Sequence, residues 1–506
     1  MSIGLTQSVA LLGLTGSVVE IEVDISDGIP MYSLLGLPDT ALQESRDRVR
    51  AALTNCNEAW PNRKVTVSLS PAWLPKSGSS FDLSIALAIA IAQGALPQEP
   101  FAHSVILGEL ALDGKVRSVR GVLPALIAAY KSGITHAIVP AANKAEAQLM
   151  SQMAILTFEN LRDVFLWGRT GHYVTAPELD LLQIENDGYL DFADVAGQSK
   201  ARFAAEVAAS GGHHLLLIGP PGTGKTMIAT RIPTILPALT LDQALEVTAV
   251  HSISGALGSR SAMSRVAPIV SPHHTASRAA IVGGGSHVIK PGPCSLAHRG
   301  VLFIDEAPEC AIGVLDSLRQ PLESGTITIT RSVGNITFPA HFLLVLAANP
   351  CPCGKYTGKG RNCTCSSVQV RRYLGKLSGP LMDRIDMRVQ VEPVSRVEMA
   401  QTQPGESSAD IRARVLTARD AAMRRFHDEP WSLNAEIRSR ALRGKYRPER
   451  DAMNFLHDEL DRERITARGL HKVIRLSWTL ADLSGHSTPN LDDVKRAHSL
   501  REGTDL

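Results

Sequence analysis

The 506-residue chain lacks any apolar run long enough to cross a membrane. The longest run, residues 85–92, falls far short of the roughly 20 residues that a bilayer requires and is typical of a buried helix. Residues 1–14 have no basic residue before their apolar stretch and no convincing cleavage site, so we expect no secretory signal. These absences favour a cytoplasmic protein.

The chain is also short of net charge and of a disulfide pattern. It has 52 Lys and Arg residues against 50 Asp and Glu residues, so nucleic-acid binding would require a local basic patch. The seven cysteines are an odd number, and Cys56, Cys294 and Cys310 stand apart. This does not fit a disulfide framework in so large a chain, and we expect reduced thiols.

The length and the hydrophobic fraction of 44% predict a globular protein of about two to four domains. In the first domain, residues 1–168, apolar and polar residues alternate around 19–25 and 65–69, which is typical of half-buried strands. The Ala- and Leu-rich stretches 81–92 and 121–131 predict helices. An α+β fold is therefore expected here.

Residues 169–190 lose this periodicity and contain Gly, Pro and polar residues, so we interpret them as a linker. Beyond them, runs that are apolar throughout alternate with helical stretches, as in the buried parallel sheet of an α/β domain. We place this domain at 191–394 and a helical domain at 395–506. The runs are "HLLLIG" ending at Gly219, "VLFIDE" at 301–306, "FLLVLAAN" at 342–349 and "MRVQVEP" at 387–393.

A phosphate-binding motif follows the first of these runs. "GPPGTGKT" fits G-x-x-x-x-G-K-[ST], with a strand before it and the start of a helix after it. Glycines let backbone N–H groups surround phosphates, while the lysine adds a positive charge and the threonine offers a hydroxyl to Mg²⁺. The predicted nucleotide-binding residues are Gly219, Pro220, Pro221, Gly222, Thr223, Gly224, Lys225 and Thr226.

A second motif supplies the carboxylates that ATP hydrolysis needs. In "VLFIDE", an apolar strand ends in Asp305, which suits the Mg²⁺ shell together with Thr226. Glu306 suits the role of general base toward the attacking water. An apolar run ending in Asp-Glu is common by itself, but its place after a phosphate loop in an alternating β/α chain makes it specific.

With these motifs in place, the chain resembles AAA+ ATPases, and within them the magnesium-chelatase-like group with an insert at helix 2. The resemblance is to the ComM (YifB) competence protein family and covers nearly the full length. It implies a P-loop parallel-sheet core with that insert, a helical lid and a hexameric ring. The stretches that carry it are "SLAHRGVLFIDE", "LRQPLESGTITITR", "FPAHFLLVLAANPCPCG" and "LSGPLMDRIDM".

The same resemblance implies roles for residues outside the loop. Asp194 and Val195, in "DVAGQ", would lie against the adenine. Asn349 matches the sensor-1 position, and Arg384 matches the arginine finger that a neighbouring subunit offers to the γ-phosphate. Arg468 matches sensor 2 on a lid helix. For either arginine, the alternative is a solvated helix face.

Two further segments are candidates for contact with DNA. The Gly/Ser/His-rich region at 255–296 is too long for an ordinary connection and matches the helix-2 insert of the resembled family. Residues 324–340 predict a hairpin at the pre-sensor-1 position. The alternative is surface loops that pack against neighbouring subunits. We interpret His273 and His274 as structural or surface residues and not as a metal-binding pair. The basic candidates are His287, Lys290 and Arg331.

The N-terminal stretches "LPKSGSSFDLSIALAIA" and "GELALDGKVRSVRGVLPALIAAYKSGITHAIVP" resemble the Lon-type peptidase fold (ribosomal protein S5 domain 2-like), which the RadA recombination protein also contains. Ser80 falls at the nucleophile position, but the candidate positions for the lysine base hold Val122, Leu123, Pro124 and Ala125. An unactivated serine is a poor nucleophile. We therefore expect no peptidase activity, and instead a role in DNA contact or ring assembly.

Four cysteines cluster immediately after Asn349. The pattern C-x-C-x9-C-x-C supplies four thiolates, enough for a closed tetrahedral zinc site with a Gly- and Lys-rich loop tied between the two pairs. C-x-C is less typical of zinc than C-x2-C, so reduced thiols and a redox disulfide stay as alternatives. The four residues are Cys351, Cys353, Cys363 and Cys365.

The resemblance implies an ATP- and Mg²⁺-dependent ring motor that moves branched or single-stranded DNA junctions. Such a branch-migration helicase would assist homologous recombination and the integration of transforming DNA. The alternatives are a chelatase-like motor and a regulatory ATPase that remodels proteins, neither acting on DNA. The chelatase motor subunit has no Lon-like N-terminal domain, which weighs against the first alternative.

Overall fold

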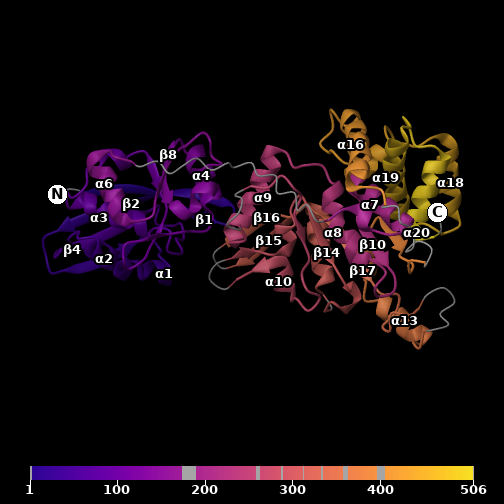
Figure 1. The fold of residues 1–506 in the computed structure, drawn as a ribbon, viewed down its shortest axis with the longest axis horizontal. Helices are drawn as coiled ribbons and strands as arrows, with labels where there is room; N and C mark the ends of the chain where they lie inside the picture. The colour runs from indigo at the N-terminus through magenta and orange to yellow at the C-terminus, as the bar shows by residue number, and fades with distance from the viewer. Residues whose placement is uncertain are drawn as a thin grey trace.

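The computed structural model describes residues 3–173, 190–257, 263–285, 289–311, 313–331, 334–356, 363–395 and 405–504, with only the backbone of Arg331 and Gly334. The molecule is elongated, and the N-terminal sheet, the central sheet and the C-terminal helices follow one another along its longest axis (Figure 1). Residues 174–189 of the predicted linker lie outside the described residues, and its first two residues, 169–170, belong to the last helix of the N-terminal part. In the described parts, no helix combines the length and apolarity that a membrane span requires.

The N-terminal part is built on a seven-stranded mixed sheet of order β3-β4-β2-β1-β5-β8-β9. The predicted alternation is confirmed in β2, where Val19, Ile21 and Val23 are buried and Glu20 and Glu22 are exposed. Strand β2 is antiparallel to β1 and β4, and the other pairs are parallel. The strands are β1 (Gly4–Leu12), β2 (Thr15–Ser26), β3 (Met31–Leu35), β4 (Lys64–Ser70), β5 (Ser104–Ile106), β8 (His136–Pro140) and β9 (Ala154–Phe158).

Both helices predicted in this part are present. Helix α3 (Asp82–Ala92) is buried along its whole length, which is why it is apolar on every side. It lies so close to β1 that a Cβ atom at Gly4 would stand 2.0 Å from the carbonyl oxygen of Ala88. The other helices are α1 (Thr40–Gln43), α2 (Ser45–Asn55), α4 (Val122–Lys131), α5 (Lys144–Ala147) and α6 (Leu161–Thr170), with a small hairpin of β6 (Glu109–Leu110) and β7 (Val116–Arg117).

The central part is a five-stranded parallel sheet of order β11-β14-β17-β10-β18. The four predicted apolar strands are all present, and the parallel sheet is confirmed. Strand β11 was not predicted, because two residues inside a Gly/Ser/His-rich region carry no periodicity. The strands are β10 (Leu215–Ile218), β11 (Ile269–Val270), β14 (Val301–Ile304), β17 (Leu343–Ala348) and β18 (Met387–Gln390).

Both faces of this sheet are covered, which explains why its strands are apolar throughout. On one face, Leu217, Phe303 and Val345 pack with α7 (Ser199–Gly211), α8 (Lys225–Ile235) and the C-terminal helices. On the other face, residues such as Leu344 pack with α12 (Arg319–Ser324) and the predicted hairpin, which is confirmed. The remaining elements here are β15 (Thr326–Arg331), β16 (Gly334–Pro339), α9 (Leu241–Ser254), α10 (Arg278–Val282), β12 (Gly283–Gly284), β13 (Lys290–Pro291), α11 (Pro293–Leu296), α13 (Ser367–Leu374) and α14 (Gly379–Met382).

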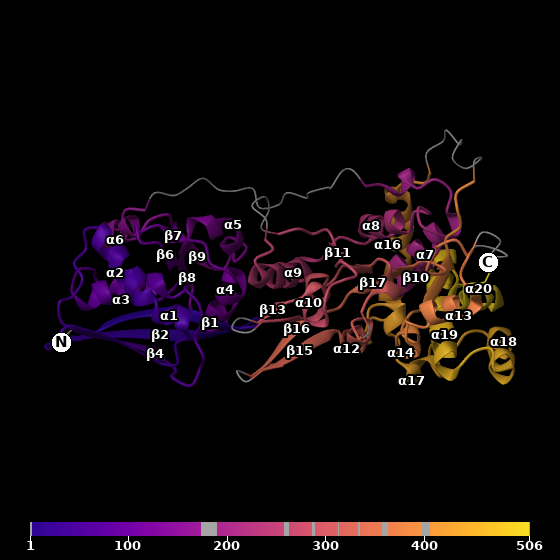
Figure 2. The ribbon, with the colours of Figure 1, turned by 90° about the horizontal axis from the view of Figure 1, so that it is seen from below.

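From residue 405, the described chain is helical, as its composition predicts. Side chains fix where the long helices begin: Thr466 accepts from the Gly469 N–H at the start of α19, and Asn490 forms a capping box with Asp493 at the start of α20. These helices pack on α7 at one end of the central sheet (Figure 2). They are α16 (Ser408–Arg425), α17 (Ser439–Leu442), α18 (Arg450–Asp461), α19 (Ala467–Ser484) and α20 (Leu491–Glu502).

The N-terminal part is docked on the central part through α9. Ala249 of α9 joins the apolar cluster around Val122 and Leu126 of α4, and the two helices lie side by side in both views (Figures 1 and 2). Beside them, the hydroxyl of Ser252 donates to the buried carboxylate of Glu146. Burial raises the pKa of that carboxyl group.

Candidate nucleotide site

The phosphate loop connects the end of β10 to the start of α8, which begins at Lys225. Gly222 and Gly224 both have left-handed backbones, with φ of 76° and 89°, which glycine adopts without strain. The turn therefore brings the N-terminus of α8, with its unpaired N–H groups, to the carboxyl edge of the sheet.

Lys225 lies inside this loop. Its ammonium group donates to the carbonyl oxygens of Gly219 and Pro220 at 2.7 and 2.8 Å, and its Nζ lies 3.3 Å from Oδ1 of Asn349. Burial lowers the pKa of Lys225, while the carboxylates of Asp305 and Glu306 act in the opposite direction. The structure thus brings together the predicted lysine and the predicted sensor.

Two of the predicted magnesium-site groups also meet. The hydroxyl of Thr226 donates to Oδ2 of Asp305 at 2.7 Å, and the N–H of Glu306 donates to Oδ1 of Asp305 at 2.9 Å. A hydroxyl and a carboxylate oxygen at the carboxyl edge of the sheet are ligands that Mg²⁺ accepts. The residues present therefore fit a magnesium ion bound beside a nucleotide phosphate.

Glu306 has a left-handed backbone, with φ of 49°, and its side chain is 49% exposed. Its Oε2 lies 3.3 Å from Nδ1 of His274. That histidine follows β11, which pairs with β14, so the parallel register brings the two strand ends together. The interpretation of His274 as merely structural missed this contact.

A cleft of about 520 Å³ opens between the central sheet and the C-terminal helices. Gln198 links it to the phosphate loop, because its amide donates to the Thr223 carbonyl at 3.0 Å. The cleft has the size and mixed polarity of a small-ligand site. Its wall comes from the start of α7, from Arg388 and Gln390 on β18, from residues 392–394, and from Ser499, Leu500, Gly503 and Thr504 at the end of α20.

The predicted adenine contacts, Asp194 and Val195, do not line this cleft. Val195 is buried, and Asp194 is bound by Arg231 of α8 at 2.8 Å, which holds the pKa of that carboxyl below its usual range. These two residues fasten the segment before α7, and Gln198, four residues after Asp194, is the side chain that reaches the cleft.

Arg384 does not join the phosphate loop of its own chain. Its guanidinium binds the carboxylate of Glu323 and donates to the Pro380 carbonyl at 2.5 Å. Arg468, at the start of α19, is exposed and lies 3.5 Å from Asp383. Both predicted arginines therefore lie at one end of the sheet beside each other, separate from Lys225.

A buried network fixes the backbone around Arg384. Lys472 of α19 donates to the Arg384 carbonyl at 2.7 Å and to Oδ1 of Asp386 at 2.5 Å. Burial by itself would raise the pKa of Asp386, but Lys472 outweighs it and holds that pKa well below its usual range. Burial also lowers the pKa values of the adjacent His213 and His214 to about 4, so both are neutral near pH 7.

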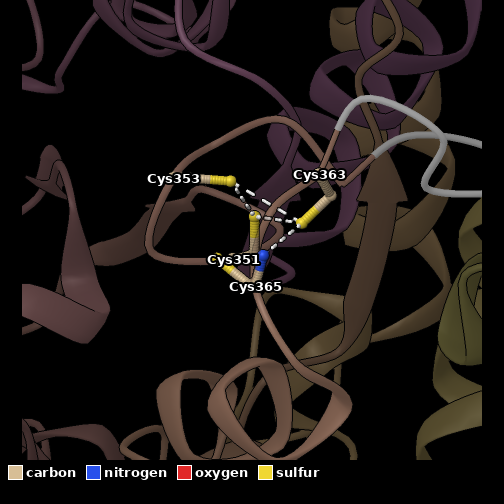
Figure 3. A group of neighbouring side chains, drawn as sticks. All are labelled: Cys351, Cys353, Cys363 and Cys365. Carbon is tan, nitrogen blue, oxygen red and sulfur yellow. Dashed lines mark hydrogen bonds between the residues drawn. The ribbon is translucent and has the colours of Figure 1, made fainter.

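The four clustered cysteines meet in space (Figure 3). Their sulfur atoms all lie within 4.8 Å of one another, and the thiols are not joined in disulfides. Cys351 is fully buried and the other three are half-buried. The arrangement contradicts neither zinc nor reduced thiols, but it places four soft ligands around one point.

Comparisons with known proteins bear on this whole arrangement. The family described as magnesium chelatase, subunit ChlI, matches residues 191–399, and the related descriptions of that subunit and of its C-terminal part match residues 21–143 and 405–501. Competence protein ComM of Haemophilus influenzae is 41% identical over 96% of this chain and 94% of its own. The chain belongs to the magnesium-chelatase-like ComM family.

Two further relatives match nearly the whole length of the chain. An uncharacterized protein of Mycobacterium tuberculosis is 47% identical over 99% of both chains, and the uncharacterized protein YifB of Escherichia coli is 38% identical over 99% of this chain and 97% of its own. The magnesium-chelatase 38 kDa subunit of Cereibacter sphaeroides is 25% identical over 46% of this chain. Membership of the family places the chain among AAA+ ATPases and supports ATP and Mg²⁺ as its cofactors.

The N-terminal part of this ComM-family chain has no lysine where a Lon-type base would stand. Val122, Leu123 and Ala125 are buried in the first turn of α4, packed among apolar side chains. The Lon protease of Mesomycoplasma hyopneumoniae is 30% identical over 28% of this chain and 17% of its own. This short likeness leaves the Lon-like fold a prediction.

Sequence reasoning missed several residues of the candidate site. His274 and Lys472 act on strand ends far away in the sequence, and the cleft residues at the end of α20 have no motif of their own. Of the basic residues predicted for DNA, Lys290 is exposed, whereas His287 and the Arg331 side chain lie outside the described residues. Gln198 alone had a signal, because it belongs to the quoted "DVAGQ" stretch.

Proposed function

We propose that this protein is an ATP-hydrolysing AAA+ ring motor that acts on DNA, as a branch-migration helicase that aids homologous recombination and the integration of transforming DNA. The observation that carries the ATPase part is the meeting of Lys225, Thr226, Asp305 and Asn349 at one edge of a parallel sheet. Those groups supply a cation, two metal ligands and an amide around the turn where a phosphate chain binds.

The site residues then take the following parts. Residues 219–226 bind the β- and γ-phosphates, and Thr226 and Asp305 hold Mg²⁺, which neutralises charge on the phosphates when bound. Glu306 accepts the proton of the attacking water, and Asn349 orients that water or the γ-phosphate. The adenosine occupies the cleft beside Gln198 and Arg388. Asp194 and Val195 fasten the chain segment that leads to Gln198 and so position this wall of the cleft.

Arg384 completes the site of a neighbouring subunit in a hexameric ring. Arg384 binds Glu323 and the Pro380 carbonyl and not the phosphate loop of its own chain, and Glu323 is exposed, which supports this assignment. Arg468, beside Asp383 on the lid, is assigned to sensing the nucleotide at the same boundary. A guanidinium offered at that point neutralises charge that develops in the transition state.

The DNA part of the proposal rests on the family. The relative named for competence matches almost the whole chain, whereas the chelatase subunit matches less than half of it at lower identity. We place DNA contacts on the insert and on the β15–β16 hairpin. The second candidate, a chelatase-like or protein-remodelling ATPase without DNA activity, would use the same nucleotide site.

We assign the domains as residues 1–168, a linker at 169–190, an ATPase core at 191–394 and a helical lid at 395–506. The first domain is assigned a Lon-like fold without peptidase activity, which contributes to DNA contact or ring assembly. We propose a cytoplasmic location. We also propose that Cys351, Cys353, Cys363 and Cys365 bind a structural Zn²⁺ ion, as their spacing predicts and as the meeting of their sulfur atoms supports.

A junction assay tests the motor. Wild-type protein and Lys225→Ala are incubated with ATP, Mg²⁺ and three- or four-strand DNA junctions, and both phosphate release and strand exchange are measured. We expect DNA-stimulated hydrolysis and junction movement in the wild type and neither in the variant. Hydrolysis that responds to protein but not to DNA, or magnesium–porphyrin formation with partner subunits, would favour the second candidate.

A further inference from the structure

The cysteine cluster has the dimensions of a closed tetrahedral thiolate site. The Sγ atoms of Cys351, Cys353 and Cys363 are separated by 3.4, 3.6 and 3.6 Å. Four sulfurs at about 2.3 Å from a central zinc ion are about 3.8 Å apart. These three sulfurs are spaced slightly more closely than that, and the Cys365 sulfur lies within 4.8 Å of each of them. The N–H of Cys365 points to Sγ of Cys363 at 3.4 Å, a contact that stabilises a thiolate.

This cluster lies directly against the phosphate loop. The turn from Cys351 is closed by a hydrogen bond from the Gly354 N–H to the Cys351 carbonyl at 2.9 Å. Gly354 has a φ of +71°, and a Cβ atom on it would stand 2.6 Å from Cδ of Pro221. The backbone of the cysteine turn and the ring of a phosphate-loop proline are therefore in direct contact, with no room for a side chain between them.

The chain segments before and after the cysteine cluster both approach Asn349. Cys351 follows Asn349 by two residues, and the second cysteine pair leads into α13 through the capping residue Ser366. Tyr373 of that helix is buried; burial raises its pKa, and a hydrogen bond from the Asn349 backbone acts in the opposite direction. One chain segment that leaves the cluster therefore leads back to Asn349, which contacts Lys225, and the other leads to Tyr373 beside the Asn349 backbone.

We propose that the zinc ion bound by these four cysteines fixes the wall of the nucleotide site, by holding the Cys351–Gly354 turn against Pro221 and holding Asn349 beside Lys225. This inference rests on the proposed function, because it assumes that the loop binds ATP. The turn has no helix or strand to order it, and metal binding supplies the free energy of ordering that secondary structure supplies elsewhere.

The test measures metal content and nucleotide binding separately. Purified wild type, Cys353→Ser and Cys56→Ala are analysed for zinc per chain by mass spectrometry, and for the Kd of a fluorescent ATP analogue in the presence of Mg²⁺. Cys56→Ala is the matched control, because it removes a buried thiol in the N-terminal part. A third variant, Gly354→Ala, keeps all four ligands and places a methyl group against Pro221.

We expect one zinc ion per chain in the wild type and in Cys56→Ala, with equal nucleotide affinity. Cys353→Ser loses zinc and raises Kd by about tenfold or more, since small misplacements of a binding group are costly. Gly354→Ala raises Kd while it keeps zinc. Zinc well below one ion per chain in wild type grown with ample zinc would overturn the site.

Further outcomes separate this inference from the proposed function. Loss of zinc without a change in Kd, or a normal Kd in Gly354→Ala, would overturn the bracing role and leave the ATPase proposal standing. A wild type that carries zinc but binds no nucleotide would overturn the proposed function instead. A visible absorption typical of iron and an absence of zinc would replace zinc by an iron site and would overturn the proposal as stated.

Discussion

The carboxylate groups of Asp82 in the N-terminal part and of Asp305 and Glu306 in the central part have opposite environments, buried in the first and accessible in the second. In the N-terminal part, Asp82 is fully buried and accepts from two nitrogens of Arg48 at 2.7 and 2.9 Å, so its carboxylate is paired within the protein and is not accessible to a ligand. In the central part, Asp305 and Glu306 stand at the open edge of the sheet beside the phosphate loop. A buried carboxylate that is paired within the protein stabilises the fold. An accessible carboxylate can instead interact with a bound molecule.

Strand direction explains part of this difference. Strands β14, β17 and β10 are neighbours and parallel, so Asp305, Asn349 and Gly219 all leave the sheet at the same edge. In the N-terminal sheet, the corresponding place at the start of α4 is filled by buried apolar residues. Polar groups therefore meet at an open edge of the central sheet, whereas apolar side chains fill the corresponding place in the N-terminal part.

The largest effect is expected at the phosphate loop. Lys225→Ala removes the charge at the phosphates and Glu306→Gln removes the base, so each should lower ATP hydrolysis by about a thousandfold or more. Steady-state phosphate release measures this. Glu306→Gln should still bind nucleotide, which separates a failed reaction from a failed fold. Near-normal hydrolysis in either variant would show that the edge of the central sheet is not the catalytic site.

The next effect concerns Arg384. Arg384→Ala should lower hydrolysis about a hundredfold by removing a charge offered to the γ-phosphate. Because the residue is assigned to a neighbouring subunit, a mixture of Arg384→Ala and Lys225→Ala chains should regain part of the activity that both lack alone. Phosphate release from the mixture and from each variant alone would be compared. No regain at any mixing ratio contradicts action between subunits.

Acid should affect the two halves in opposite directions. His213 and His214 have folded pKa values lowered by burial to about 4, so the unfolded chain binds more protons and their contribution to stability is lost as the pH falls from about 6.5 to 4. Burial raises the pKa of Asp82 to about 6, so its folded state binds the extra proton and gains stability as the pH falls from about 6 to 3.8.

Each shift is worth on the order of 3 kcal/mol at most. Hydrogen exchange of backbone amides from pH 6.5 to 4.5, corrected for intrinsic rates, reports the two regions separately. Protection should fall first in β10 and α19 and hold in α3. Uniform loss of protection across all three elements would show that the two halves unfold as one unit.

A smaller effect is expected from the histidine pair. His274→Ala removes the contact to Glu306 and should lower the turnover number about fivefold, as for one lost polar contact worth about 1 kcal/mol, with little change in KM. His273→Ala is the matched control, because the His273 ring contacts Thr275 and the His274 ring and has no contact with Glu306 among those found in the described residues. Equal turnover in the two variants would return His274 to a structural role.

The smallest effect is expected in the N-terminal sheet. Ser80→Ala should leave ATP hydrolysis and thermal stability unchanged, since no base stands at the positions predicted for it. Incubation of the wild type with unfolded protein substrates should release no peptides. Peptide release that Ser80→Ala abolishes would show that another group activates the serine, and the contrast between the halves would fail.

The sequence predicted what depends on neighbours along the chain. The four apolar strands, the phosphate loop and helix α3 each carry a local pattern, namely uninterrupted apolarity, fixed glycine spacing or a buried face. The site residues Thr226 and Asp305 could be paired in advance, because the ends of parallel strands meet at one edge.

The remaining parts depend on contacts that no local pattern records. Strand β11 is too short for any period, yet its pairing with β14 is what delivers His274. The cleft takes one wall from the end of α20, nearly the last described residues, because the C-terminal helices fold back on β18. Asp194 does not line this cleft, since it forms an ion pair with Arg231, and its predicted contact with the adenine stays a prediction.

Lys472 connects the C-terminal helices directly to the backbone of Arg384. Its ammonium group joins α19 to the carbonyl of Arg384 and to Asp386 in a largely buried position, which shields both hydrogen bonds from solvent. Helix α19 packs on α20, which forms a wall of the nucleotide cleft. In the proposed ring, a tilt of these helices around a bound nucleotide would move the backbone of Arg384 and would carry the nucleotide state of one subunit to the site of its neighbour.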